Sequence, residues 1–283
     1  MITHDTATTP VTTREEAVVQ GEAEYAALLA MLHPLTGEDW ARPTDCPGWT
    51  VRDMVAHVNG AAEEAVSRKV QARHLLMART RDRKVPTVDS LSAQQVADRW
   101  RRAPEELVAE LERLGPAAPR ARSRTPGLVR NRPMPAGSGC LPGDTMAYLI
   151  DVIYSRDVWM HRIDIARATG CTMPMSAAEH AIVGQVVRDL ARGWSGPPFT
   201  LALTGRVEGS WHVGHDAGHD AGHDAGDGAG DGGTVTVDTV ALCRLLSGRS
   251  DEAQPSYDEP DSGRDPGRDP GLLDRLRRTR VLF

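Results

Sequence analysis

The sequence predicts a multidomain protein in which an all-α four-helix bundle, residues 1–172, precedes a small α+β domain, residues 173–283. Before Gly170, four long stretches carry apolar residues at helical spacing, and loops rich in proline and glycine join them. In the second part, residues 199–204 alternate apolar and polar side chains between a proline and a glycine, which is typical of a strand. The change of pattern indicates the domain boundary.

Composition excludes several classes of function. The 283 residues carry a net charge of -6, which gives no reason to expect a nucleic acid as a partner. No run approaches the ~18 consecutive apolar residues of a membrane span, and the polar N-terminus does not resemble a signal peptide. Because the cysteines are scattered and form no C-x2-C pair, we expect reduced thiols and a cytoplasmic protein. They are Cys46, Cys140, Cys171 and Cys243.

Two of the four stretches are residues 14–33 and 92–114, and Pro104 marks a kink or a second start in the latter. The helical pattern that starts at residue 50 continues through residues 61–77, and residues 148–170 form the fourth stretch. Residues 115–143 are rich in proline, glycine and arginine. The arginines of this segment either face solvent in an ordinary loop or line the approach of an anionic ligand. They are Arg120, Arg122, Arg124, Arg130 and Arg132.

A sharply marked helix start lies at residue 50. Thr50 is a good N-cap, and Asp53 occupies the capping-box position three residues later. Trp49 and Met54 occupy the two positions of a hydrophobic staple. His57 then falls at the edge of the apolar stripe of this helix, where a packed or surface histidine and a metal ligand are both compatible with the pattern.

Residues 148–170 predict a long helix that ends at Gly170. Its positions at three- and four-residue steps form one stripe, apolar in the first half. The second half places Asp157, His161 and Asp164 where apolar residues are due, and a carboxylate facing a core is costly unless it is paired or binds a metal. Asp157 and His161 lie one turn apart, as two ligands of one cation would. A solvated or internally paired helix face is the ordinary alternative.

The second domain is expected to contain a helix, three strands and a further short helix, at residues 176–194, 199–204, 206–213, 234–238 and 239–246. Two low-complexity segments, residues 214–233 and 257–271, are predicted to be disordered, and residues 272–283 to dock as a last helix or strand. The first segment repeats G-H-D-A, and the glycine in each unit disfavours a helix by up to ~1 kcal/mol. Any metal affinity of His215, His219 and His223 would then be adventitious.

Two stretches together resemble the DinB-like, mycothiol-dependent maleylpyruvate isomerase family: D-C-P-G-W-T-V-R-D-M-V-A-H (Asp45–His57) and S-R-D-V-W-M-H-R-I-D-I-A-R-A-T-G (Ser155–Gly170). The resemblance implies a DinB-like metal-binding bundle and a sterol-carrier-like second domain. It also implies that His57, Asp157 and His161 hold a divalent metal. Asp157 stands where the characterised isomerases have glutamate, so the position or affinity of the metal can differ.

The resemblance implies an enzyme that uses mycothiol as a thiol cosubstrate. Two imidazoles and one carboxylate are a common catalytic zinc set that leaves a fourth position open. A thiol bound there is kept as thiolate, ready to isomerise a small anionic electrophile or to be transferred to it. Asp164 is a candidate for orienting the site or for a helix-face salt bridge with Arg162 or Arg167. Arg249 either holds a substrate carboxylate or has a structural role.

A competing interpretation is a metal- or ligand-binding module without catalysis. An open coordination position favours the enzyme, whereas a fourth protein ligand would favour a structural site. Neither interpretation requires a membrane or a nucleic acid, and both leave open a monomer or a homodimer.

Overall fold

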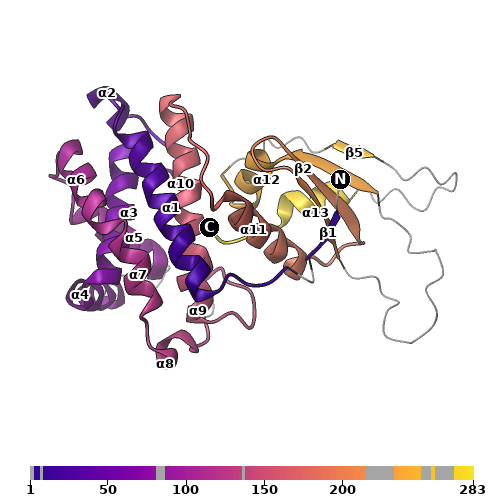
Figure 1. Cartoon of the computed structure of the whole chain (residues 1–283), viewed down its shortest axis with the longest axis horizontal. Coiled ribbons are helices and arrows are strands. Elements are labelled where there is room, and N and C mark those ends of the chain that lie inside the picture. Colours follow the sequence, from indigo (N-terminus) through magenta and orange to yellow (C-terminus); the bar gives the residue numbers. More distant parts are fainter. Residues whose placement is uncertain are drawn as a thin grey trace, which may run out of the picture. The chain divides into compact units, whose positions relative to one another are not determined.

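A computed structural model describes residues 3–6, 9–80, 87–135, 138–214, 233–249, 256–258 and 271–283 (Figure 1). The chain divides into two compact units, and the division falls within a helix, between Ile182 and Val183. We call Thr12–Ile182, with Phe283, the helical unit and Met1–Val11, with Val183–Leu282, the sheet unit.

This division differs from the boundary expected between residues 172 and 173. Arg162 contacts the carbonyl of Pro174 and the carboxylate of Glu179 (3.5 Å), which ties the segment after Gly170 to the helical unit. Met1–Val11 belongs to the sheet unit because a strand near the N-terminus joins the sheet.

The predicted helical region is confirmed, with more helices than expected. Its elements are α1 (Arg14–Leu32), α2 (Gly37–Trp40), α3 (Val51–Val66), α4 (Arg68–Thr80), α5 (Thr87–Ala97), α6 (Pro104–Leu114), α7 (Ala117–Ser123), α8 (Gly127–Arg130), α9 (Met146–Tyr148), the π-helix η2 (Leu149–Ile153) and α10 (Tyr154–Thr169). Among the described residues, no helix is both long and apolar enough to cross a membrane.

Local signals set the ends of the two helices that matter most. Thr50 caps α3, accepting from the amide of Asp53 (3.3 Å) while the Asp53 carboxylate accepts from the Thr50 amide (3.0 Å), which confirms the capping box. α10 ends at Gly170, whose φ of +73° is the left-handed conformation that glycine adopts without strain. These caps position the side chains of the site described below.

Several predicted helical stretches are interrupted, or begin and end, at residues other than those expected. The helical pattern of residues 61–77 is interrupted at Ser67, which is extended between α3 and α4. Residues 92–114 form two helices, and Pro104 starts the second, where its missing amide proton costs no hydrogen bond. The arginine-rich segment 115–143 is not merely a solvated loop, because it contains α7 and α8 and buries Arg122 and Arg130.

α1, α3, α6 and α10 enclose the core of the helical unit. Its buried side chains are Tyr25, Leu28, Met31, Leu32, Trp40, Val51, Met54, Val55, Ala56, Val58, Ala62, Leu107, Leu111, Leu114, Ala118, Val158 and Ile165. Two close approaches need glycine. A Cβ on Gly21 would lie 2.7 Å from Pro119 Cγ of α7, and one on Gly60 would lie 2.4 Å from Gln95 Cβ of α5.

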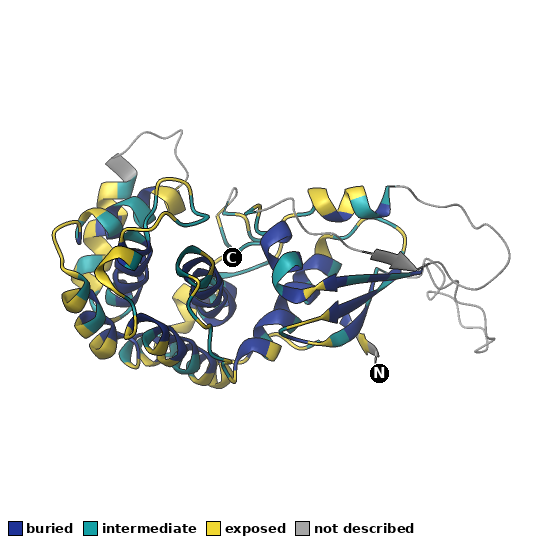
Figure 2. Ribbon diagram, turned by 90° about the horizontal axis from the view of Figure 1, so that it is seen from above, coloured by how far each residue is buried: buried dark blue, intermediate teal, exposed yellow. Residues whose placement is uncertain are grey.

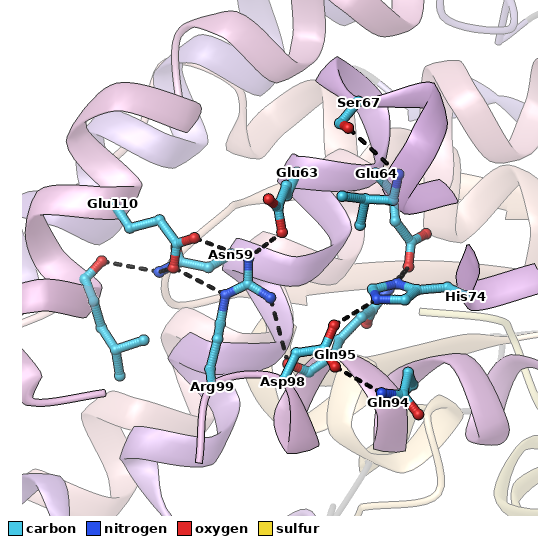
Figure 3. A network of polar contacts seen from close by, with 12 residues as sticks. Asn59, Glu63, Glu64, Ser67, His74, Gln94, Gln95, Asp98, Arg99 and Glu110 are labelled. Atoms are coloured by element: carbon cyan, nitrogen blue, oxygen red, sulfur yellow. Dashed lines mark hydrogen bonds and ion pairs between the residues drawn. The ribbon is translucent and has the colours of Figure 1, made fainter. Parts of the chain in front are cut away.

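A network of polar contacts joins α3 to α4, α5 and α6 (Figure 3). Arg99 donates to both Glu110 oxygens (2.9 Å each) and to Glu63 (2.7 Å). The fully buried ring of His74 lies between Glu64 (2.6 Å) and Asp98 (2.8 Å). Buried charges of this kind are tolerated because each is paired.

Among the described residues of the sheet unit, five strands form one sheet in the order β1-β3-β2-β4-β5. Three described helices accompany it, of which the first, α11, begins in the helical unit. The elements are β1 (Thr3–Asp5), α11 (Glu179–Gly193), β2 (Phe199–Thr204), β3 (Gly209–Val213), β4 (Thr234–Asp238), α12 (Thr239–Leu246), β5 (Ser256–Asp258) and α13 (Leu272–Arg278). The central strand β2 pairs antiparallel with β3 and parallel with β4. Figure 2 shows that much of β2, β3 and β4 is buried.

Helices and strands predicted for this part are present, with two differences. β1 was not predicted, and Tyr257, placed in a segment predicted to be disordered, pairs with Val235 as part of β5. Residues 215–232 and 259–270, which make up most of the two low-complexity segments, lie outside the described residues.

Candidate metal centre

His57, Asp157 and His161 lie together in the helical unit. α3 carries His57, and α10 carries Asp157 and His161 one turn apart. The Nε2 atom of His161 lies 3.2 Å from Asp157 Oδ1, and that of His57 lies 3.5 Å from Asp157 Oδ2. The two imidazole rings are 5.2 Å apart and nearly perpendicular, at 86°. The sequence-based grouping is therefore brought together in space.

The three side chains fit a divalent metal by geometry and chemistry. One ligand atom from each lies within 4.8 Å of the others. Ligands 2.0–2.2 Å from a tetrahedral ion are about 3.4 Å apart, close to the two separations given above. The buried Nδ1 of His57 has no hydrogen-bond partner in the part of the chain that the structure describes. The Nε2 atom of His57 faces Asp157, so the contacts with this carboxylate and with the Trp49 ring set the position of His57.

Asp157 and His161 are strongly coupled electrostatically. Burial opposes ionisation of Asp157, but the charge of His161, followed by hydrogen bonds from both histidines, holds the pKa of Asp157 well below its usual value. Burial also disfavours the charged form of His161, yet Asp157 raises the pKa of His161 well above its usual value. The Asp157 side chain is 21% exposed, whereas the two histidines are buried, so the cluster opens at the carboxylate.

Asp164 contacts His161 from the other side of the ring. Its carboxylate is fully buried, and Oδ2 lies 3.3 Å from His161 Nδ1. A carboxylate at Nδ1 favours the tautomer with the proton there and leaves Nε2 free to bind a metal. Arg162 pairs with Glu24 (2.6 Å), and Arg167 with Asp45 (3.1 Å). The orienting role predicted for Asp164 thus has the geometry it requires and stays a prediction.

Two residues near the site were not predicted to be there. Cys46 Sγ lies 3.8 Å from Asp164 Oδ2. The ring of Trp49 lies 5.1 Å from that of His57 and 6.4 Å from that of His161, so Trp49 forms an aromatic wall in addition to its helix-start position. Both belong to the D-C-P-G-W motif, which is the only sequence signal that could have found them.

A buried cation lies behind Asp157. Arg122 stacks its guanidinium 3.7 Å from the ring centre of Tyr154, one turn before Asp157, and donates to the Tyr25 hydroxyl (3.3 Å) and the Ala61 carbonyl (3.0 Å). Burial raises the pKa of Tyr154, and the Arg122 charge opposes this rise. Arg122 therefore adds positive potential to this side of the cluster.

The remaining arginines lie in other surroundings. Arg120 pairs with Glu22 at the surface (2.5 Å), and Arg130 pairs with Asp151 in the interior. Arg124 and Arg132 are exposed. Arg249 lies in the sheet unit, just after α12, where its amide donates to the Arg244 carbonyl (2.9 Å). Both roles considered for Arg249, holding a substrate carboxylate or a structural role, stay predictions.

Fold and site together define a class: a helical domain with a His–Asp–His cluster between two of its helices, joined to a small α+β domain. The sequence pattern of the family "Mycothiol maleylpyruvate isomerase N-terminal domain" matches residues 22–166, just over half of the 283 residues. The chain belongs to this family, which confirms the resemblance seen in its motifs.

Two crystal structures have a similar fold. They are those of the mycothiol-dependent maleylpyruvate isomerase (17% identity) and of a histidine-to-alanine mutant of that enzyme (16% identity). Each comparison covers 92% of this chain and 98% of the other, with a TM-score of 0.50. The likeness therefore extends over both units. Among curated proteins, no sequence matches the chain.

Proposed function

We propose that the protein is a divalent-metal-dependent enzyme that uses mycothiol to isomerise a small anionic electrophile or to transfer the thiol to it. The observation that carries this proposal is the convergence of His57, Asp157 and His161, within 4.8 Å of one another, in a member of the mycothiol maleylpyruvate isomerase family. When bound, a zinc-like ion with these three ligands supplies an open position at which a thiol loses its proton.

The protein's own residues do the rest of the work in this proposal. Asp164 holds the His161 ring with Nε2 turned towards Asp157. Trp49 contributes an apolar surface beside the two histidine rings. Arg122 adds positive charge near Asp157, which favours an anionic thiolate or a substrate carboxylate. Arg249 is a further candidate for holding a substrate carboxylate.

Metal analysis and calorimetry test the proposal. We expect the purified protein to bind one equivalent of zinc, and the zinc-loaded protein to bind mycothiol. His161→Ala should lose both, because it removes one of the three ligands. His33→Ala is the matched control, since the His33 side chain is 56% exposed and lies outside the cluster. It should behave as wild type.

The outcomes separate the enzyme from the non-catalytic alternative. Zinc binding without mycothiol binding would contradict the thiol-dependent enzyme and favour a metal- or ligand-binding module. Where both bind, maleylpyruvate, the substrate named for the two similar crystal structures, is the first acceptor to test by following loss of the cis isomer. Adduct formation without isomerisation would select transfer over isomerisation.

A further inference from the structure

Asp164 is a buried carboxylate reached by two donors through the same oxygen. It is 0% exposed, and its Oδ2 atom lies 3.3 Å from His161 Nδ1 and 3.8 Å from Cys46 Sγ. The sulfur distance is within the range of a thiol hydrogen bond. A thiol can donate its proton to a carboxylate, whereas an ionised carboxylate can only accept. Cys46 therefore contacts the group that orients His161.

The thiol is aimed by its own loop and not by chance proximity. The Cys46 amide donates to Thr44 Oγ1 (3.3 Å), and its carbonyl accepts from the Trp49 amide (3.0 Å). Asp45, the preceding residue, accepts from Arg167 of α10 (3.1 Å). The loop is thus fixed at both sides of Cys46, and it is attached to the helix that carries Asp164.

We propose that Cys46 is a positioning residue of the metal centre, which acts through Asp164 to hold His161 for metal binding. This rests on the proposed function only in that His57, Asp157 and His161 bind a metal. The thiol proton occupies one lone pair of the buried Oδ2 and so fixes the plane of the carboxylate. The carboxylate in turn fixes the plane of the imidazole. Removing the thiol leaves a buried acceptor with one donor fewer.

Residues that orient metal ligands typically change metal affinity by 10–100-fold when altered. We expect that range for Asp164→Asn, and a smaller loss of about 3- to 10-fold for Cys46→Ala, because a thiol is a weak donor. Cys46→Ser should remain within about 2-fold of wild type, because the hydroxyl keeps a donor on the same Cβ, and O–H is a stronger donor than S–H. Cys140→Ala, a partly exposed cysteine of the same unit outside this cluster, should have no effect.

The measurement is the zinc dissociation constant, obtained by competition with a chromogenic chelator, with the thermal midpoint of each metal-free variant as a check on folding. Equal zinc affinity of Cys46→Ala and wild type would overturn the inference, as would an equal loss in Cys46→Ser and Cys46→Ala. If wild type binds no zinc, the proposed function fails as well. If wild type binds zinc and Cys46→Ala is unaffected, only this inference fails.

The same three side chains could instead hold a second cation, since one ligand atom each from Cys46, His161 and Asp164 also lies within 4.8 Å of the others. Cobalt substitution distinguishes the two. A positioning thiol predicts one equivalent of cobalt and no sulfur-to-cobalt charge-transfer band before mycothiol is added. Two equivalents, with a charge-transfer band that disappears in Cys46→Ala, would make Cys46 a metal ligand and overturn the positioning role.

Discussion

His161 is the residue on which both sides of the proposed centre depend. Its Nε2 faces Asp157 and its Nδ1 faces Asp164, so each ring nitrogen has a carboxylate neighbour. A histidine between two carboxylates is rigidly oriented, which suits a ligand that must point one nitrogen at a metal. His57 lacks a second partner of this kind among the described residues. We infer that orientation of the centre is set mainly from α10.

The three candidate ligands could be grouped from the sequence because both motifs that resemble the family lie in strongly marked helices. The capping box at Thr50 sets the register of His57, and the helical spacing puts Asp157 and His161 on one face. Cys46 could not be predicted in the same way, because it contacts Asp164 across 118 positions of sequence. No periodicity links a loop residue to a helix so far away.

Asp98 gives a prediction about acid stability. Burial opposes its ionisation, but hydrogen bonds from His74, Gln94 and Arg73 outweigh burial and lower the pKa of Asp98 below its ordinary value of 3.8 (Figure 3). A carboxyl whose pKa is lower in the folded state stabilises the fold above its unfolded pKa. That stabilisation is lost as pH falls from about 4 through the folded pKa.

Asp98→Asn should therefore lower the free energy of unfolding at pH 7 by about 1–3 kcal/mol. It should also flatten the decline in stability below about pH 4. Urea unfolding across pH measures both effects. Asp274→Asn is the control, because Asp274 forms an exposed pair with Arg277 and its loss should stay within about 0.5 kcal/mol. An unchanged pH dependence in Asp98→Asn would show that this carboxyl does not contribute.

At the scale of elements, caps and glycine stops were predictable, whereas short helices were not. The segment that forms α7 contains proline and arginines, a composition that is typical of a loop. Its helix is held by tertiary packing, with Pro119 against Gly21 and the Arg122 guanidinium against Tyr154. Such contacts involve partners distant in sequence, so local patterns do not show them.

The long helix predicted for residues 148–170 contains a π-helical turn that was not expected. η2 covers Leu149–Ile153, so the apolar first half of the stripe has a π-helical turn, whereas the second half, which carries the candidate ligands, is the regular α-helix α10. Asp151 within η2 is buried and pairs with Arg130 of α8. π-turns occur frequently at functional sites, and this one directly precedes the helix that carries Asp157 and His161.

Because α3 and α5 approach closely at Gly60, we expect two glycine-to-alanine substitutions to change the free energy of unfolding in opposite directions. Gly60→Ala should destabilise by about 1–3 kcal/mol, because the new methyl would lie 2.4 Å from Gln95 Cβ and 3.1 Å from its Cα. Gly184→Ala in α11 meets nothing within 4 Å and should stabilise by about 0.5–1 kcal/mol. Thermal or urea unfolding of each variant measures this. Stabilisation by Gly60→Ala would contradict the packing of these two helices.

For the whole molecule, the two kinds of unit were predictable from the change of pattern after Gly170. The membership of the N-terminal residues was not. β1 is three residues long and pairs in parallel with β3, with Thr3 opposite Ser210. A strand this short has no periodicity to detect, and its partner β3, Gly209–Val213, is distant in sequence. The sheet unit is therefore built from both ends of the chain.

The position of the candidate ligands in the helical unit predicts that the G-H-D-A repeat is dispensable for tight metal binding. A variant in which a short Gly/Ser linker replaces residues 215–232 keeps Gly214 and Gly233, which flank β3 and β4, and keeps the Thr200–Gly233 backbone hydrogen bond (2.9 Å). We expect it to retain one equivalent of tightly bound zinc, with an affinity within about 2-fold of wild type, because His57, Asp157 and His161 are untouched.

Glycine in every unit of the repeat disfavours a helix, and ordering a glycine-rich segment costs conformational entropy, so we expect its histidines to add only weak zinc binding. Zinc titration of wild type, the linker variant and His161→Ala separates the two kinds of binding. The linker variant should lose the weakly bound zinc and keep the one tightly bound equivalent. His161→Ala should lose the tightly bound equivalent and keep the weakly bound zinc. Loss of the tight equivalent in the linker variant, with its retention in His161→Ala, would place the metal on the repeat and remove the basis of the proposed centre.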